Sequence, residues 1–182
     1  MKSNKIRIIG GEWRSRIVRF PDAKDLRPTP DRMRETLFNW LGQDLTGRVC
    51  LDLFAGSGAL GFEAASRGAR RVVMIERDAA VHRALDEARS ALGARQVELL
   101  RADAFGFLAS DGQHYDVVFL DPPFRENWLP RLLPMLAPRL ATEARIYLES
   151  PQPPDALPDG YAVLKRARAG QVHGLLIKYA AP

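Results

Sequence analysis

The sequence contains a single cysteine and three histidines among 182 residues, and this scarcity excludes several kinds of site. Cys50 has no partner for a disulfide within the chain and lies in an apolar run, so we expect it to pack rather than to react. His82, His114 and His173 stand too far apart for the spacing of a zinc site. We therefore expect no metal ion in this protein.

The sequence also lacks long hydrophobic runs. No apolar stretch approaches the roughly 20 residues that a membrane-spanning helix requires. The first seven residues include Lys2, Lys5 and Arg7, without the hydrophobic segment of a signal peptide. A length of 182 residues with 46% apolar side chains is typical of one globular domain. We therefore expect a cytoplasmic protein that does not bind membranes.

The net charge of +5 is confined to the first 40 residues. That segment holds ten basic and five acidic residues, and the chain totals of 27 and 22 leave 17 of each kind for the rest. Such asymmetry favours a polyanionic partner, and nucleic acid first of all. A charged arm that is simply solvated would have the same composition.

Two short β-prone runs flank a pair of glycines near the N-terminus. Residues 6–9 and 16–20 lie on either side of Gly10 and Gly11, a pattern typical of a β-hairpin. The second run alternates basic and apolar residues, so one face of the hairpin should be cationic. Trp13 could stack on a base, but packing beneath the hairpin is the simpler expectation.

A helix should follow, with Thr29 as its N-cap and Pro30 in the first helical position. Arg32 and Arg34 would then lie in the first turns, where the helix dipole disfavours cations. Their presence there indicates an anionic ligand nearby. Surface ion pairs with Asp31 or Glu35 are the alternative explanation.

Apolar runs and helical patterns alternate from residue 47 onward. This alternation predicts an α/β fold with a mostly parallel sheet, helices on both faces and right-handed crossovers. We expect one compact unit, in which residues 1–46 form a basic extension and residues 47–182 form the main domain. The expected strands are residues 49–54, 72–75, 95–100, 115–120 and 145–149. The expected helices are residues 58–67, 78–92 and 103–110, with a short or broken helix in residues 128–140. Residues 161–168 and 172–179 should form a C-terminal β-hairpin.

Glycines follow the first of these strands. Gly56, Gly58 and Gly61 would let the backbone approach a ligand closely, at the start of a helix whose first N–H groups are free. Their spacing also fits the dinucleotide-binding fingerprint. The glycines alone therefore do not separate a nicotinamide cofactor from other adenosine ligands.

Acidic residues at the strand ends favour one of these ligands. Asp52 lies in the first strand, Glu76 ends the second about 20 residues after the first glycine, and Asp103 follows the third. Asp52 suits a charged amino acid moiety, Glu76 suits two ribose hydroxyls, and Asp103 suits an adenine amino group. An enzyme that uses a nicotinamide cofactor needs neither Asp52 nor Asp103. An adenosyl donor that carries an amino acid uses all three acids.

The tetrapeptide Asp121-Pro122-Pro123-Phe124 directly follows the strand expected at residues 115–120. Two prolines cannot continue a sheet ladder, and they fix an extended turn at the edge where open α/β sheets bind ligands. The aspartate and nearby carbonyls would accept hydrogen bonds from an amino group, and Phe124 would stack on a base. Acceptors on both N–H groups would aim the amine lone pair at an electrophile, which predicts amine alkylation by positioning. A Pro-Pro loop whose aspartate caps the next helix would explain the same residues.

Together these motifs resemble those of the Rossmann-like S-adenosylmethionine-dependent methyltransferases. The run from Asp52 to Gly58 and the acid Glu76 are similar to the donor motifs of that superfamily, and the tetrapeptide at residues 121–124 is similar to its catalytic motif. Residues 27–39, RPTPDRMRETLFN, resemble the signature of the bacterial 16S rRNA guanine-N2 methyltransferases. That family shares the basic N-terminal hairpin and a similar length, so the resemblance covers essentially the whole chain.

The resemblance implies methylation of one guanine amino group in the 16S rRNA of a small-subunit particle, with S-adenosylmethionine as the cofactor and no metal. It leaves open whether Asp121 only accepts hydrogen bonds or also takes a proton. We expect a monomer. The expected catalytic residues are Asp121, Pro122, Pro123 and Phe124, the expected donor-binding residues are Asp52, Ala55, Gly56, Ser57, Gly58, Glu76, Arg77, Asp103, Ala104 and Asp121, and the expected RNA-binding residues are Arg7, Arg14, Arg16, Arg27, Arg32 and Arg34.

Three other functions fit parts of the sequence. A methyltransferase that acts on adenine N6 or cytosine N4 amines of DNA would share the Asp-Pro-Pro-aromatic loop. An NAD-binding oxidoreductase would share the glycines. A non-catalytic RNA-binding protein could keep the same fold, but the intact acids Asp52, Glu76 and Asp121 argue against it.

Overall fold

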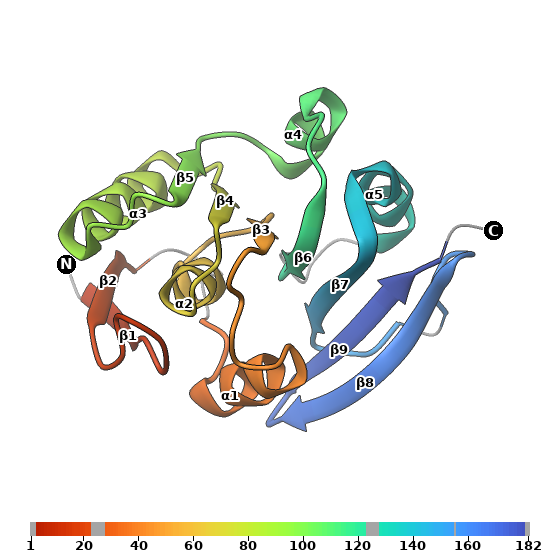
Figure 1. Ribbon diagram of the computed structural model, residues 1–182, viewed down its shortest axis with the longest axis horizontal. Helices are drawn as coiled ribbons and strands as arrows, with labels where there is room; N and C mark the ends of the chain where they lie inside the picture. Colours follow the sequence, from red (N-terminus) through yellow and green to blue (C-terminus); the bar gives the residue numbers. More distant parts are fainter. Residues whose placement is uncertain (1–2, 23–27, 123–127, 155, 181–182) are drawn as a thin grey trace.

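The computed structural model describes residues 3–22, 28–122, 128–154 and 156–180, which form a seven-stranded sheet, a separate two-stranded hairpin and helices on both faces of the sheet (Figure 1). The strand order is β5-β4-β3-β6-β7-β9-β8. The strands from β5 to β7 run parallel, whereas β9 runs antiparallel to both β7 and β8. These strands are β3 (Val49–Asp52), β4 (Arg71–Ile75), β5 (Val97–Leu100), β6 (Tyr115–Leu120), β7 (Leu140–Ser150), β8 (Tyr161–Ala169) and β9 (Val172–Tyr179).

The helices connect the parallel strands, as the alternating pattern predicts. The Rossmann-like α/β prediction and the C-terminal hairpin are confirmed. The third strand begins at Val97 rather than at residue 95, because Ala94 and Arg95 still belong to the turn after the preceding helix. The helices are α1 (Asp31–Trp40), α2 (Ala59–Ser66), α3 (Ala79–Leu92), α4 (Ala104–Ser110), α5 (Leu129–Leu136) and the 3₁₀ helix η1 (Ala137–Arg139).

Alternation along the strands divides the interior into two cores. Cys50 and Phe119 point to the face that α1, α2 and α3 cover, and Leu51 and Val118 point to the face that α4 and α5 cover. Both faces are therefore apolar, which explains the nearly continuous hydrophobic runs of β3 and β6. Cys50 is fully buried, as its apolar run predicts.

The N-terminal hairpin pairs β1 (Ser3–Arg7) with β2 (Ile17–Pro21) in antiparallel register, so the hairpin prediction is confirmed. Its inner side chains, including Val18 and Phe20, share one core with the sheet residues of the same face. Trp13 is buried in that core and packs beneath the hairpin, as expected. The hairpin lies against α2 and α3 at the left of Figure 1.

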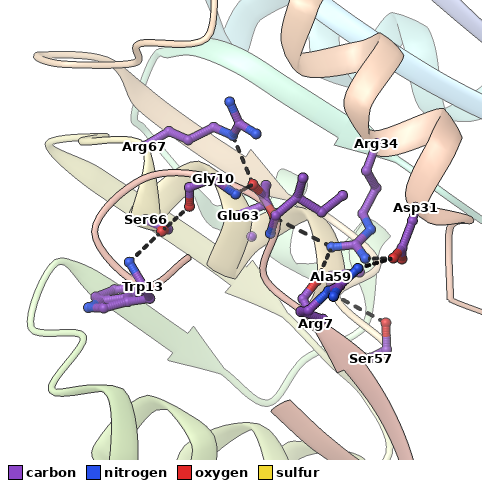
Figure 2. A network of polar contacts seen from close by, with 12 residues as sticks. Arg7, Gly10, Trp13, Asp31, Arg34, Ser57, Ala59, Glu63, Ser66 and Arg67 are labelled. Atoms are coloured by element: carbon purple, nitrogen blue, oxygen red, sulfur yellow. Dashed lines mark hydrogen bonds and ion pairs between the residues drawn. The ribbon is translucent and has the colours of Figure 1, made fainter. Parts of the chain in front are cut away.

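One carboxylate on α2 fixes the hairpin loop to the main body (Figure 2). Glu63 accepts hydrogen bonds from the backbone N–H groups of Ile9 and Gly10, each at 2.8 Å. Its oxygens also meet Arg34 Nη1 at 3.4 Å and Arg67 Nε at 2.9 Å. The hairpin, α1 and α2 are thus joined at a single buried charge.

The start of α1 differs from the prediction. The helix begins at Asp31 after Pro30, and no side chain caps it, so the expected N-cap role of Thr29 is wrong. Thr29 is buried, and its side chain bonds to Glu149 instead. A tertiary partner of this kind competes successfully with a local cap because a buried carboxylate needs donors.

In the ranges described above, none of the helices combines the length and the hydrophobicity that crossing a membrane requires.

Candidate functional site

Three acidic side chains lie at the carboxyl ends of three adjacent parallel strands. Asp52 ends β3, Asp121 directly follows β6, and Glu149 is the penultimate residue of β7. In the sheet register Asp52 pairs with Phe119, and Phe119 pairs with Tyr147. Because side chains alternate, Asp121 and Glu149 lie two residues further along the same face. This edge is where open α/β sheets bind ligands.

Asp52 connects the first strand of the site to the helix that follows it. Its side chain is 2% exposed, and its Oδ2 accepts a hydrogen bond from Gly61 N at 2.9 Å. Burial raises the pKa of this carboxyl to about 7, and the charge of Glu76 adds to the rise. A positively charged ligand group would favour the ionised form. Asp52 therefore suits the ammonium of an amino acid moiety.

Glu76 follows β4 and turns back toward the glycine loop. Its Oε2 accepts a hydrogen bond from Gly56 N at 3.0 Å, and its Oε1 accepts one from Asp78 N at 2.7 Å. Each carboxylate oxygen has two acceptor positions, so both oxygens can still accept a ligand hydroxyl. Arg77, beside it, is exposed.

The glycine loop comes close to the core at Gly58, which precedes α2 with φ +76°. A Cβ atom at this position would lie 2.6 Å from Phe62 Cδ2, so both the backbone conformation and the packing require glycine. Ala55 and Ser57 are buried in the same loop. The loop therefore offers a ligand mainly its backbone.

Asp103 caps α4, where its Oδ1 accepts a hydrogen bond from Gly106 N at 2.9 Å. Asp103 is exposed, and Ala104 after it is buried. Phe105 stacks on Trp128 with ring centroids 5.1 Å apart, and Phe54 meets the same indole edge-on at 5.5 Å. An apolar wall next to an exposed acid suits adenine, which has a flat ring and an amino group.

Asp121 and Glu149 are close enough to affect the ionisation of one another. Burial raises the pKa of Asp121 well above its usual range, and the charges of Glu149 and Asp52 raise it further. Burial also raises the pKa of Glu149, against hydrogen bonds from Thr29 and from Tyr147, whose hydroxyl lies 3.0 Å from Glu149 Oε2. Within the described ranges neither acid pairs with a basic side chain. The two acids therefore offer acceptors to a ligand that carries N–H groups.

The tetrapeptide at residues 121–124 is described only in part. Asp121 and Pro122 are half-buried at the end of β6, whereas Pro123 and Phe124 lie outside the described residues. The expected stacking on Phe124 therefore stays a prediction.

Most of the expected RNA-binding arginines lie on the surface. Arg7, Arg14, Arg16 and Arg32 are exposed, and Arg27 lies outside the described residues. Their contacts with RNA stay predictions.

Two cations that we did not include among the RNA-binding residues lie on the outer face of the hairpin. Lys5 stands directly opposite Arg19 in the register of β1 and β2, and both are exposed. Like charges in this position repel one another, which an anion bound across them would relieve.

Arg34 does not belong to this exposed set. Its side chain has no solvent exposure, and its guanidinium contacts Asp31 Oδ1 at 2.5 Å, Glu63 Oε2 at 3.4 Å and the carbonyl oxygen of Arg7 at 3.0 Å. The expected contact between Arg34 and a phosphate is therefore wrong. The alternative of an ion pair with Asp31 is correct, and Glu63 adds a partner that the sequence spacing did not suggest.

Glu149, Tyr147 and Thr29 are the residues of the site that the sequence analysis missed. The signal was present, because Glu149 ends the fifth expected strand just as Asp52, Glu76 and Asp103 accompany the first three. Recognising it required the strand order, since only the sheet shows that β7 neighbours β6.

A separate cleft of about 460 Å³ lies at the opposite edge of the sheet, around the amino ends of β3 to β6. Arg71 is paired there with Glu98 through Nε at 3.1 Å and with Gln113 at 2.5 Å. Arg71, Glu98 and Gln113 thus satisfy one another in this cleft. It is remote in the fold from the acids of the carboxyl edge.

The donor set fits an S-adenosylmethionine molecule in chemical terms. A buried acid of raised pKa, an acid on the glycine loop and an exposed acid beside an aromatic wall match an ammonium, a ribose and an adenine, respectively. Among the residues with described positions, no group of three or more His, Cys, Asp or Glu is arranged to hold a metal ion.

Comparisons with known proteins identify the relatives of this chain. The family model described as "Conserved hypothetical protein 95" matches residues 6–178. The Ribosomal RNA small subunit methyltransferase D of Escherichia coli is 48% identical over 150 residues, which cover 81% of this chain and 76% of that one. The protein of the same name from Haemophilus influenzae is 39% identical and covers 92% and 91%.

Solved structures agree with the sequence relatives. A candidate methyltransferase from Escherichia coli superposes with a TM-score of 0.88 at 43% identity, over 98% of this chain and all of the other. A candidate methylase from Haemophilus influenzae has a TM-score of 0.80 at 36% identity, with the same coverage. The chain therefore belongs to the Conserved hypothetical protein 95 family, together with the Ribosomal RNA small subunit methyltransferase D proteins.

Proposed function

We propose that this protein methylates the exocyclic N2 amine of a guanine in the 16S rRNA of the small ribosomal subunit, with S-adenosylmethionine as the methyl donor. The names of the relatives support a small-subunit rRNA methyltransferase. The pair Asp121 and Glu149 supports an amine as the methylated group, because these two neighbouring acids have no basic partners among the described residues. An exocyclic amine supplies the hydrogen-bond donors that this pair lacks.

The residues of the chain position the two reactants. Asp52 would hold the ammonium of the donor, Glu76 its ribose hydroxyls and Asp103 its adenine amine, each at the carboxyl edge of the sheet. When bound, the donor supplies a methyl group on a positively charged sulfur. Asp121 accepts a hydrogen bond from the amine, which turns the nitrogen lone pair toward that methyl group.

Transfer is then a direct displacement that uses no covalent intermediate with the enzyme. The amine nitrogen would gain the methyl group as the sulfur–methyl bond breaks and the neutral thioether leaves, and the nitrogen would afterwards lose one proton. Asp121, when ionised, is adjacent to receive that proton. Asp121→Asn distinguishes a base from a carboxylate that only accepts a hydrogen bond, because an amide accepts a hydrogen bond but takes no proton at neutral pH.

A methyl-transfer assay with labelled S-adenosylmethionine tests the proposal. The substrates are small ribosomal subunits, and naked 16S rRNA, from cells that lack this protein, followed by nucleoside analysis of the product. Label in N2-methylguanosine is the expected result. Label in another nucleoside, or labelling of duplex DNA instead, would replace guanine or rRNA as the target. Donor binding without transfer to either RNA would contradict the proposed reaction.

A further inference from the structure

Glu149 is a buried acid that the donor site does not use. Its side chain is 2% exposed at the end of β7, one strand beyond Asp121 and two strands beyond Asp52. Removing an ionisable carboxyl from water is costly unless partners compensate it. No cation in the described ranges compensates Glu149, and a neutral side chain would fill the same volume at lower cost.

Two hydroxyl groups hold Glu149 in place without saturating it. Tyr147 donates to Oε2 at 3.0 Å from two residues earlier on the same strand, and Thr29 bonds to the carboxyl from the segment before α1. A carboxylate has about four acceptor positions, so about two are left for a ligand. Asp121 next to it is partly exposed, so a ligand would approach the pair from the side of Asp121.

The Watson–Crick edge of guanine matches this arrangement. Its N1–H and one N2–H lie side by side and point the same way, so the two oxygens of one carboxylate can accept both. Adenine and cytosine instead present a ring nitrogen with a lone pair next to their amine. A carboxylate without a proton, the form that the positive charge of a bound donor favours, repels that lone pair and is left with an unsatisfied oxygen.

We propose that Glu149 is the residue that selects guanine. It accepts hydrogen bonds from N1–H and one N2–H of the flipped base, while Asp121 accepts from the other N2–H. The inference rests on the proposed function, and it goes further by assigning the choice of base to one carboxylate. Sites built to bond a substrate donor reject analogues that lack it by up to about 10⁴-fold or more.

The test uses a base that keeps the amine but changes the ring nitrogen. 2-Aminopurine has the exocyclic amine at C2, but its N1 carries a lone pair in place of the proton and its C6 carries hydrogen in place of the carbonyl oxygen. The change in preference between wild type and Glu149→Gln therefore isolates the contact at N1. It is placed at the position that the wild-type enzyme labels, by ligation of a synthetic oligonucleotide into 16S rRNA. The ratio of kcat/KM for guanine to kcat/KM for 2-aminopurine is then measured by methyl transfer.

Wild-type enzyme should prefer guanine by at least about 100-fold. In Glu149→Gln the amide can donate to N1 of 2-aminopurine, so the preference should fall by at least about tenfold, with the affinity for the donor unchanged in calorimetry. Glu143→Gln, at an exposed position on the same strand, is the matched control and should keep the wild-type ratio. Tyr147→Phe should weaken the preference partly, because it frees Glu149 to move.

The outcomes separate the two proposals. Wild-type enzyme that methylates 2-aminopurine as well as guanine would overturn the role of Glu149 without needing any variant. The same follows if Glu149→Gln is folded, binds the donor and keeps the full preference. If wild-type enzyme does not methylate guanine at all, the proposed function fails, and the inference fails with it.

Discussion

Arg34 and Glu63 form an ion pair in which neither side chain has any solvent exposure, with Arg34 Nη1 3.4 Å from Glu63 Oε2. Glu63 also holds the backbone of the hairpin loop, at Ile9 and Gly10 (Figure 2). The arginine that the sequence suggested as an RNA contact therefore connects the N-terminal hairpin to the main domain. The charge of Arg34 therefore contributes to the stability of the fold rather than to ligand binding.

Breaking this pair should destabilise the protein strongly. Glu63→Gln removes the negative charge that Arg34 and Arg67 share, and loss of one partner from a buried pair typically costs about 3–5 kcal/mol. The free energy of unfolding from denaturant titrations measures the effect. The control is Glu143→Gln in the exposed pair with Arg145, which should cost less than about 1 kcal/mol. A loss that small at Glu63 would contradict the role of the pair.

Gly11→Ala should detach the hairpin loop. Gly11 has φ +74°, and a Cβ atom there would lie 1.8 Å from the carbonyl oxygen of Ser66. The clash would break the hydrogen bond from Glu12 N to that oxygen, which is 2.7 Å long. We expect faster amide hydrogen exchange in residues 8–16 and a lower melting temperature.

Gly47→Ala provides the control for this substitution. Gly47 has a similar φ of +79°, but nothing lies within 4 Å of its Cβ position. It therefore carries the same backbone strain, about 1 kcal/mol, without the clash. Equal effects of the two substitutions would show that packing against Ser66 does not matter.

Asp121→Ala should abolish methyl transfer while leaving donor affinity nearly unchanged. The carboxylate is a positioned acceptor, and removal of one such group costs on the order of 10²–10³ in kcat. Asp121→Asn separates the two roles, because an amide accepts a hydrogen bond but takes no proton at neutral pH. Near-normal activity of the Asn variant would show that Asp121 only accepts a hydrogen bond and does not act as a base. Lost donor affinity in calorimetry would instead move Asp121 to the donor site.

The affinity for the donor should depend on pH through Asp52. The pKa of this carboxyl is raised to about 7 in the folded protein, whereas the usual value is 3.8. An ammonium group binds the ionised form, so the dissociation constant should rise about tenfold for each pH unit below 7. Calorimetry of donor binding between pH 5 and pH 8 measures this slope. A flat profile would exclude Asp52 as the ammonium partner, and Asp52→Asn should give weak binding at every pH.

The same pKa shift predicts a trend in the stability of the ligand-free protein. Because the folded pKa is raised, the contribution of Asp52 is fully present below about pH 3.8 and is lost as pH rises through about 7. Over that window the loss should be on the order of a few kcal/mol. Asp52→Asn lacks this titration, so the difference in unfolding free energy between variant and wild type should change with pH in the same window.

The outer face of the hairpin should set the salt dependence of RNA binding. Replacing Lys5 and Arg19 with glutamine removes two exposed cations that face one another. The slope of log affinity against log salt should become shallower by about 0.7 for each phosphate contact that is lost. Arg95→Gln, an exposed cation of the cleft at the amino ends of the strands, should leave the slope unchanged. An unaltered slope in the hairpin variant would place the RNA elsewhere.

The prediction of the fold succeeded because its signals are local. Runs such as residues 115–120 are apolar on both faces of a strand, and the glycines at 56–61 are needed wherever a backbone comes close to packed side chains. The strand-end acids could be found for the same reason, since parallel strands present their carboxyl ends at one edge. The hairpin was likewise visible in the sequence as two β-prone runs around glycines.

The two wrong predictions concern side chains that could bond either to a local or to a distant partner. Thr29 has the residue type and the position of an N-cap, yet its side chain bonds to Glu149, which lies 120 residues away in the chain. Arg34 has the charge of an RNA contact, but its burial depends on Glu63 from another helix. Neither partner can be inferred from spacing, because both are brought close only when α1 packs on the sheet.

The sequence by itself determined the succession of strands and helices along the chain, the glycine loop and the acids that end the strands, because periodicity and turn chemistry act over a few residues. The tertiary structure alone decided which charges are exposed and which acids are neighbours. Burial and strand order depend on contacts between distant segments, and those contacts place Glu149 beside Asp121 and remove Arg34 from the surface.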